Sequence, residues 1–246
     1  MGHAVGAASP RGADSLRDVA ARRGARAVNL ADVATGADVL IVAVPLDRVR
    51  DLPKALLASS PSSAVVDTGP YGPTPVGPIP EIDAGMPESA WVAGQLGAPV
   101  VKALSSMTAH GMEHRGRPRG ARDRVALPVA GDDAAGRARV TGTVEELGFG
   151  AHDAGPLSGS WRQQPGQPAG ATDPSPHGLP QLLARADRAR APGSRDRAMA
   201  LVARLPLGFP VPDLVRVARL SAGPGRLSPG ARLAMARLGL AAPLGR

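Results

Sequence analysis

Residues 38–44 read Asp-Val-Leu-Ile-Val-Ala-Val and contain the longest strongly apolar run of the chain, which Pro45 closes. Aliphatic and β-branched side chains at consecutive positions predict a strand that is covered on both faces, as parallel strands of α/β proteins are. The run is far too short for a membrane-spanning helix, which needs about 20 apolar residues. We therefore expect a fold built around a buried parallel sheet.

Further strand-like and helix-like segments alternate on both sides of this run. Strands are predicted at 4–8, 26–29, 64–68, 99–104, 124–130 and 151–153, and helices at 15–23, 47–57, 88–96 and 133–147, with one or two helical turns at 30–35. This alternation predicts βαβ units and a mostly parallel, Rossmann-like sheet of the α/β class.

Composition divides the chain into three parts. Residues 1–155 carry the alternating pattern, and residues 156–178 form a Gly/Pro/Gln-rich loop or linker. Residues 179–246 are predicted to be an Arg-rich helical extension. Its candidate helices are 179–191, 195–205, 213–222 and 230–240.

The formal charge of +8 is confined to the last part of the chain. Residues 1–178 hold 17 basic and 18 acidic side chains, whereas the last 68 residues hold 12 arginines and 3 aspartates. The chain has only five aromatic residues, which argues against base stacking, so no nucleic-acid partner is expected. The extension is instead expected to cover the body or to mediate self-association into a homodimer. The absence of cysteine excludes disulfides, thiolate metal sites and a cysteine nucleophile.

One metal-site pattern occurs in the sequence. His110-Gly111-Met112-Glu113-His114 matches H-x-x-E-H, a zinc-protease pattern. Gly111 weakens a helix and Pro118 stops it soon afterwards, so a solvated loop end is the preferred interpretation and no metal site is expected. The pair Asp132-Asp133 precedes a predicted helix, where carboxylates cap the N-terminus.

Several short motifs follow one another in an order that resembles a known family. They are ADVLIVAVP (37–45), VVDTGPYGP (65–73), PVVKALSSM (99–107), VAGDD (129–133), DAGPL (153–157) and QQPG (163–166). Over roughly residues 1–168 the chain resembles the NADPH-dependent, coenzyme F-420 reductase-like oxidoreductases, which are Rossmann dinucleotide-binding proteins.

The resemblance implies positions for the cofactors. Ser9 and Arg11 would hold the adenosine 2′-phosphate of NADP, since a hydroxyl and a guanidinium suit a phosphate. Val44 and Pro45 would flank the nicotinamide, and Thr68 would lie beside the cofactor. Lys102 and Ser105 would line the substrate pocket, although Ser105 stands where the family has an asparagine. No catalytic acid or base is implied, because hydride transfer needs mainly the positioning of two rings.

The family opens with a strand and a G-x-G-x-x-G turn, and neither precedes the Met1–Val5 segment. That turn supplies the backbone donors for the pyrophosphate. The expectation is that the true start lies upstream of Met1, or that this chain binds dinucleotide weakly. The predicted function is hydride transfer between NADP(H) and a deazaflavin-type carrier such as coenzyme F-420. The alternative is a non-catalytic, truncated Rossmann-like module with an interaction or regulatory role. No signal-peptide pattern opens the sequence, and no membrane partner is predicted, so a cytoplasmic protein is expected.

Overall fold

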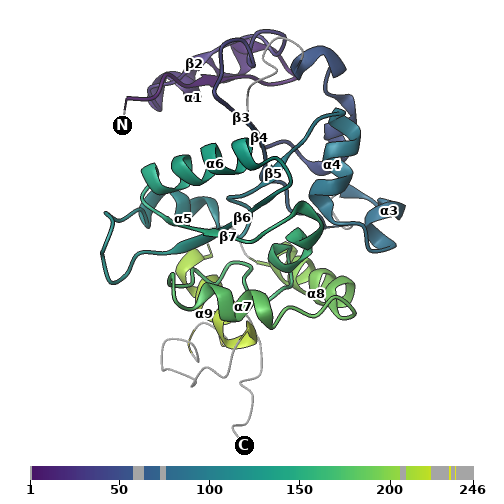
Figure 1. The fold of residues 1–246 in the computed structure, drawn as a ribbon, viewed down its shortest axis with the longest axis vertical. Coiled ribbons are helices and arrows are strands. Elements are labelled where there is room, and N and C mark those ends of the chain that lie inside the picture. The colour runs from purple at the N-terminus through teal and green to yellow at the C-terminus, as the bar shows by residue number, and fades with distance from the viewer. Residues whose placement is uncertain are drawn as a thin grey trace, which may run out of the picture.

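The computed structural model describes residues 2–57, 64–72, 76–205 and 209–222, together with residues 233 and 236. Within them the chain forms a mixed α/β body followed by helices, which confirms the predicted fold class (Figure 1). Apart from Leu233 and Ala236, the helix predicted at 230–240 lies outside the described residues.

The strands form two separate sheets. Strands β1 (Gly6–Ala7) and β2 (Arg26–Ala27) pair in parallel as a small ribbon. The main sheet has the order β3-β4-β5-β6-β7. Its strands are β3 (Val39–Val42), β4 (Ala64–Asp67), β5 (Val101–Lys102), β6 (Ala126–Gly131) and β7 (Gly150–Asp153). The division falls between β2 and β3, which do not pair with each other.

The direction of the strands changes once within the main sheet. Strand β3 pairs with β4, and β4 with β5, in parallel, whereas β5 pairs with β6 in an antiparallel register of Val101 with Gly131 and Lys102 with Ala130. Strands β6 and β7 are again parallel to each other. The first residue of β6 therefore lies at the same edge of the sheet as the carboxyl ends of β3, β4 and β5.

Helices cover both faces of the main sheet. On one face lies α6 (Ala134–Glu146), whose Val140 and Val144 pack with Val66, Val101 and Leu127. Helix α5 (Ala109–His114) contributes Met112 to this layer. The opposite face is covered by η2 (Leu46–Asp51), α3 (Pro80–Asp83), α4 (Glu88–Leu96) and η4 (Leu157–Gln163). Val42, Trp91 and Leu157 lie together in its core.

The remaining helices lie at the two ends of the body. The 3₁₀ helix η1 (Ala13–Leu16) and α1 (Arg17–Arg22) accompany the ribbon at the top of Figure 1. Helices α7 (Leu179–Ala184), α8 (Ala191–Ala203) and α9 (Val211–Ala222) gather at the other end. The segment 156–178 packs between α7 and the sheet, with Ala169 fully buried.

Some elements differ from those predicted, for local reasons. The helix expected at 47–57 is two 3₁₀ helices, η2 and η3 (Lys54–Leu57). Pro53 has no backbone N–H and forces the preceding Leu52 into an extended conformation, which interrupts the helix. The strand expected at 99–104 is only β5, because Leu104 has a φ of 63° and leaves the strand geometry.

Helix α6 begins at a capped end, as the sequence predicts. The Asp133 carboxylate accepts a 2.7 Å hydrogen bond from the Gly136 backbone N–H. We expect Asp133→Ala to lower the free energy of unfolding by about 1 kcal/mol, because the N-terminal N–H groups lose their acceptor. Asp133→Ser retains an acceptor and is expected to cost only a few tenths of a kcal/mol. Equal losses in urea denaturation of the two variants would contradict this role.

Candidate functional site

The carboxyl ends of β3, β4 and β5 gather most of the predicted site residues at one edge of the sheet. Val44 and Pro45 follow β3, Thr68 follows β4, and Lys102 ends β5. Ligands of open α/β sheets bind at this edge, where the loops after the strands diverge. The shared edge makes it the candidate functional site.

A buried cluster of charged side chains stands at the centre of this edge. The Lys102 ammonium donates to the Gly69 carbonyl at 2.6 Å. It also lies 3.2 Å from both Asp67 Oδ2 and Glu88 Oε2. Ser89 Oγ donates to the same Asp67 oxygen at 2.6 Å. The side chain of Lys102 is 0% exposed and those of the two acids are 1% exposed, so the charges are shielded from bulk solvent.

Burial and mutual attraction set the protonation of the cluster. Desolvation raises the pKa of the Glu88 carboxyl to about 7, although the Lys102 ammonium opposes this shift. Burial alone would lower the pKa of Lys102, but the carboxylates of Asp67 and Glu88 outweigh it and the pKa is raised. The lysine therefore stays protonated between two acids, one of which changes its charge near neutral pH.

The cluster holds the loop after β4 in one conformation. Gly69 N–H donates to Asp67 Oδ1 at 2.9 Å, while its carbonyl accepts from Lys102. A Cβ at Gly69 would come within 2.8 Å of Leu46 Cδ1, so a side chain here would require the buried Leu46 to move. The chemistry of the cluster is thus the positioning of a loop, and the pocket-lining role predicted for Lys102 stays a prediction.

Tyr71 extends the cluster toward the C-terminal helices. Its backbone N–H donates to Glu88 Oε1 at 3.2 Å, and its hydroxyl donates to Asp83 Oδ2 at 3.1 Å. The guanidinium of Arg195 from α8 lies 4.6 Å from the centre of the Tyr71 ring and 3.1 Å from Asp83 Oδ1. The loop after β4 is therefore tied both to the sheet and to the helical extension.

The other predicted residues of this edge have definite surroundings. Thr68 Oγ1 donates to the Val42 carbonyl at 3.1 Å and so ties the end of β4 to the end of β3. Val44 packs against the core under η2, and Pro45 is exposed at the start of η2. Ser105 Oγ is buried and has no hydrogen-bond partner among the described residues. It follows Leu104, whose left-handed conformation is a strain typical of functional sites.

Ser9 and Arg11 lie apart from these residues, in the turn after β1. The Arg11 backbone N–H donates to Ser9 Oγ at 3.2 Å, and Gly12 N–H donates to the Ser9 carbonyl at 2.9 Å. Arg11 is exposed, and among the described residues no carboxylate pairs with it. The hydroxyl and the guanidinium thus fit a phosphate. No strand pairing connects this turn to the main sheet within the described residues.

The H-x-x-E-H segment forms α5, and its side chains have other partners. Glu113 Oε1 pairs with Nη1 of Arg23, at the end of α1, at 2.6 Å. The rings of His110 and His114 stack with their centres 4.3 Å apart. No group of three or more His, Asp or Glu side chains that could hold a metal ion occurs in the part of the chain that the structure describes.

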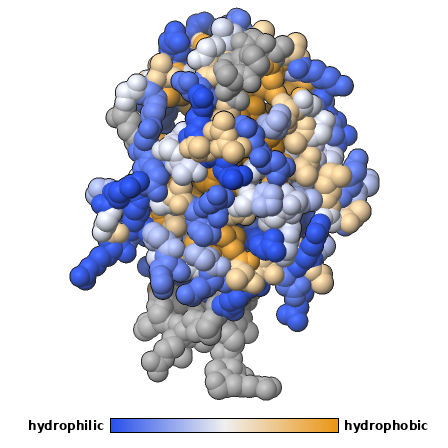
Figure 2. Space-filling view, viewed as in Figure 1, coloured by the Kyte–Doolittle hydropathy of each residue, from blue (hydrophilic) through white to orange (hydrophobic). Residues whose placement is uncertain are grey.

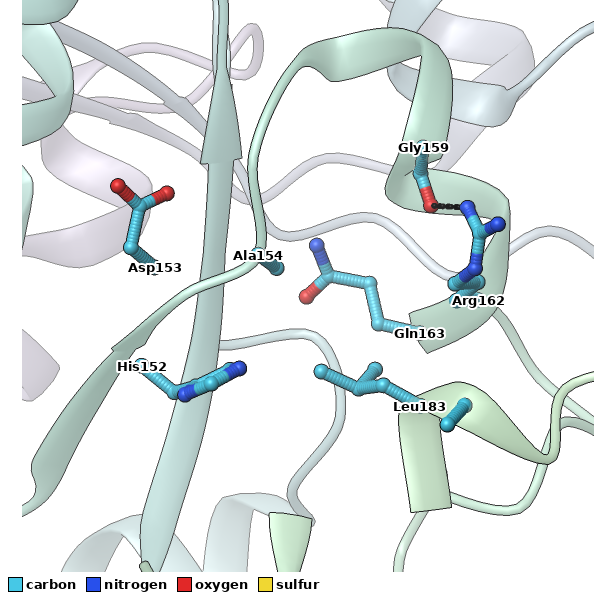
Figure 3. A pocket seen from close by; sticks show the side chains of 8 residues that line it. His152, Asp153, Ala154, Gly159, Arg162, Gln163 and Leu183 are labelled. Carbon is cyan, nitrogen blue, oxygen red and sulfur yellow. Dashed lines mark hydrogen bonds between the residues drawn. The ribbon is translucent and has the colours of Figure 1, made fainter. Parts of the chain in front are cut away.

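A small pocket of about 220 Å³ lies at the opposite edge of the sheet, between the end of β7, η4 and α7 (Figure 3). Figure 3 shows the Gln163 side chain lying between Ala154, His152 and Leu183. None of the predicted site residues lines this pocket. The predicted site and this pocket are therefore separate places in the molecule.

Sequence reasoning missed Glu88, Ser89 and Tyr71. All three are buried polar residues within 22 positions of Asp67, which itself belongs to a recognised motif. A buried lysine at the end of β5 needs nearby carboxylates, because an unpaired buried charge is very costly. The lysine in an otherwise apolar strand was the available signal for such partners.

No helix among the described residues is both long and apolar enough to cross a membrane. Hydrophilic side chains cover much of the face shown in Figure 2.

Similarity to a hypothetical protein of known structure supports the fold. The hypothetical protein SMa0349 from Sinorhizobium meliloti matches with 27% identity and a TM-score of 0.55, over 65% of this chain and 78% of that one. A proposed F420-dependent NADP reductase from Arthrobacter sp. FB24 matches with 23% identity and a TM-score of 0.40, over 56% of this chain and 64% of that one. A pyrroline-5-carboxylate reductase from Coxiella burnetii matches with 14% identity and a TM-score of 0.41, over 95% and 84% of the two chains.

No curated protein matches the chain. One family does match, over residues 1–71, and its description is NADP oxidoreductase, coenzyme F420-dependent. The matched segment holds the ribbon, β3, β4 and the loop that the buried cluster fixes. The match confirms, for residues 1–71, the resemblance that the motifs predict: this segment is similar to the coenzyme F420-dependent NADP oxidoreductases.

Proposed function

We propose that the protein is an NADP(H)-dependent oxidoreductase that transfers hydride between NADP(H) and a deazaflavin-type carrier such as coenzyme F-420. The observation that carries the proposal is the family match over residues 1–71, which includes the predicted 2′-phosphate residues Ser9 and Arg11. The strand ends at Val44 and Thr68 lie in the same segment. This placement suits a nicotinamide at the edge of the sheet.

The residues at this edge position the two rings that exchange the hydride, and they transfer no proton. A hydride moves directly between two rings when both are held in register, so the protein has to orient them and exclude water. The loop 67–71, held by its hydrogen bonds, and the strained Leu104 are suited to orient the rings in this way. The buried lysine keeps the loop rigid as a positioning residue.

The first test is cofactor binding. Tryptophan fluorescence of the full chain, titrated with NADPH, is expected to change in a saturable way. Absence of binding at millimolar NADPH would overturn the proposal. A second assay tests the identity of the carrier. It supplies reduced coenzyme F-420 with NADP as acceptor and follows the absorbance of the oxidised carrier that forms.

Ser9 and Arg11 should decide the preference for NADPH over NADH. We expect Arg11→Met to weaken NADPH binding by at least about tenfold, because one charge-assisted contact to a phosphate contributes about 1.5–3 kcal/mol. NADH has no 2′-phosphate, so its affinity should stay unchanged. Arg22→Met on α1 removes the same charge elsewhere and serves as the control. Equal losses for NADPH and NADH would contradict the 2′-phosphate role.

A second candidate function is that of an interaction module without catalysis. The observation that favours it is the division of the sheet, which leaves the side chain of Ile41 on β3 about half exposed (48%). Apolar residues on an edge strand are typical of surfaces that receive another chain. Failure of NADPH binding by a folded protein would favour this function.

A further inference from the structure

A pocket of about 490 Å³ lies beside the start of β6, at the edge that the first residue of β6 shares with the carboxyl ends of β3–β5. It is formed by the segment after α5, the loop 172–178, α7 and α9. The loop reaches β5 through a 2.8 Å hydrogen bond from Ala171 N–H to the Ser106 carbonyl. The volume is typical of sites for small organic molecules.

Five arginines line this pocket. They are Arg115, Arg122, Arg124, Arg185 and Arg219, against the two acids Asp123 and Asp173. Asp123 is paired with Arg117 at 2.9 Å, outside the lining. The wall of the pocket therefore carries an excess of positive charge, and its arginines come from three separate segments of the chain.

Two of the arginines hold the pocket in shape. Arg124 donates to the Phe149 carbonyl at 2.6 Å and to the Glu145 carboxylate at 2.7 Å. Arg219 of α9 donates to the carbonyls of Thr172 and Asp173 at 2.6 and 3.0 Å. These guanidinium groups are committed to the protein and fix the loop and α9 against the body.

The other three arginines keep their donors for a ligand. Within the described residues, the side chains of Arg115, Arg122 and Arg185 make no hydrogen bond and no ion pair, and Arg115 Nε is buried without a partner. A buried guanidinium N–H without an acceptor is costly, and an anion would relieve that cost.

Asp173 adds a second unsatisfied group. Its side chain is 8% exposed and its Oδ1 has no hydrogen-bond partner in the described structure. Burial raises the pKa of its carboxyl, opposed by Arg115, Arg219 and His110. Its φ of 45° is left-handed, as is the φ of 54° at Ala171, so the loop is held in a strained form at this wall. A hydroxyl of a ligand would satisfy Oδ1.

We propose that this pocket binds an organic phosphate, with the phosphate on Arg115, Arg122 and Arg185 and a hydroxyl of the ligand on Asp173. The planar guanidinium of arginine donates two parallel hydrogen bonds to a pair of phosphate oxygens. Three guanidinium groups without partners among the described residues line this one cavity, which is more than a ligand with a single carboxylate would need, and this favours a phosphate. The site is distinct from the predicted NADP residues Ser9 and Arg11, and the inference does not depend on the proposed function.

The test is calorimetric titration of the full chain with sodium pyrophosphate at constant ionic strength. We expect saturable binding at one site per chain. Arg115→Gln combined with Arg185→Gln should weaken it by at least about tenfold, because each variant removes a charge-assisted contact. Arg22→Gln combined with Arg26→Gln removes the same charge from exposed positions of the ribbon region, and should leave the affinity within about twofold.

Two further measurements, on another variant and with another anion, complete the test. Arg122→Gln alters an exposed side chain and should weaken binding without changing the melting temperature, which covers the case in which the double variant fails to fold. Citrate tests a carboxylate ligand in place of a phosphate. Absence of saturable pyrophosphate binding, equal losses in the control variant, or citrate binding as tight as that of pyrophosphate would each overturn the proposal. Arg11→Met should leave pyrophosphate binding unchanged, so the failure of one proposal does not decide the other.

Discussion

Lys102→Met is expected to lower the free energy of unfolding by about 3–5 kcal/mol, which is the usual cost of removing one partner from a buried ion pair. The substitution leaves Asp67 and Glu88 facing each other in a site that is closed to water. Methionine matches the length and the apolar stem of lysine, so the loss reports the charge and its hydrogen bonds, including that to the Gly69 carbonyl.

The chain offers a matched control, because its only other lysine is Lys54 on η3. This residue is exposed, and Lys54→Met should change the free energy of unfolding by less than about 0.5 kcal/mol. Guanidinium denaturation of the wild type and both variants measures the difference. Similar values for the two variants would show that the buried cluster does not stabilise the fold.

Glu88 should make stability depend on pH in a characteristic direction. Its pKa is raised to about 7 in the folded protein by burial, whereas an unfolded glutamate has its ordinary pKa near 4.5. The folded state therefore binds the proton more tightly, and the contribution of this group is complete below about pH 4.5. It is lost as the pH rises through 7, by up to about 3 kcal/mol.

The experiment compares wild type with Glu88→Gln between pH 4.5 and 8. The difference between their free energies of unfolding isolates this group, and we expect the wild type to lose stability relative to the variant as the pH rises. Glu81→Gln, at an exposed position of α3, should follow the wild type at every pH. A pH-independent difference between wild type and Glu88→Gln would contradict the raised pKa.

The sheet could be predicted because its strands have recognisable apolar runs in the sequence. The run at 38–44 and the segment at 64–68 have consecutive apolar side chains, and both become strands of a parallel pair. Strand β4 is buried throughout, whereas β3 is buried at Leu40 and Val42 and exposed at Ile41, so it is not covered on both faces as expected. The helix start at Asp133 was predictable from the capping preference of aspartate. The interruption of the helix at Pro53 could also have been predicted from the sequence, since proline restricts the conformation of the residue before it.

The candidate site was predictable only along the strands. Thr68 and Lys102 could be placed at one edge, because parallel strands end together. Glu88 could not be assigned, because a glutamate in the first turn of a helix is usually exposed, and only the tertiary structure turns this one onto Lys102. The arginine-lined pocket combines segments that are over 100 positions apart in the sequence. No local sequence pattern predicts that such distant segments lie together.

The separation of the β1–β2 ribbon from the main sheet divides the molecule into units of unequal local stability. Two exposed polar contacts join the ribbon region to the body, the ion pair of Arg23 with Glu113 and the 2.9 Å contact of His3 Nε2 with Glu146 Oε2. Salt screens such pairs, whereas the backbone ladders of β3–β7 are shielded. The ribbon should therefore open without the sheet unfolding, so the turn with Ser9 and Arg11 belongs to the less stable cooperative unit.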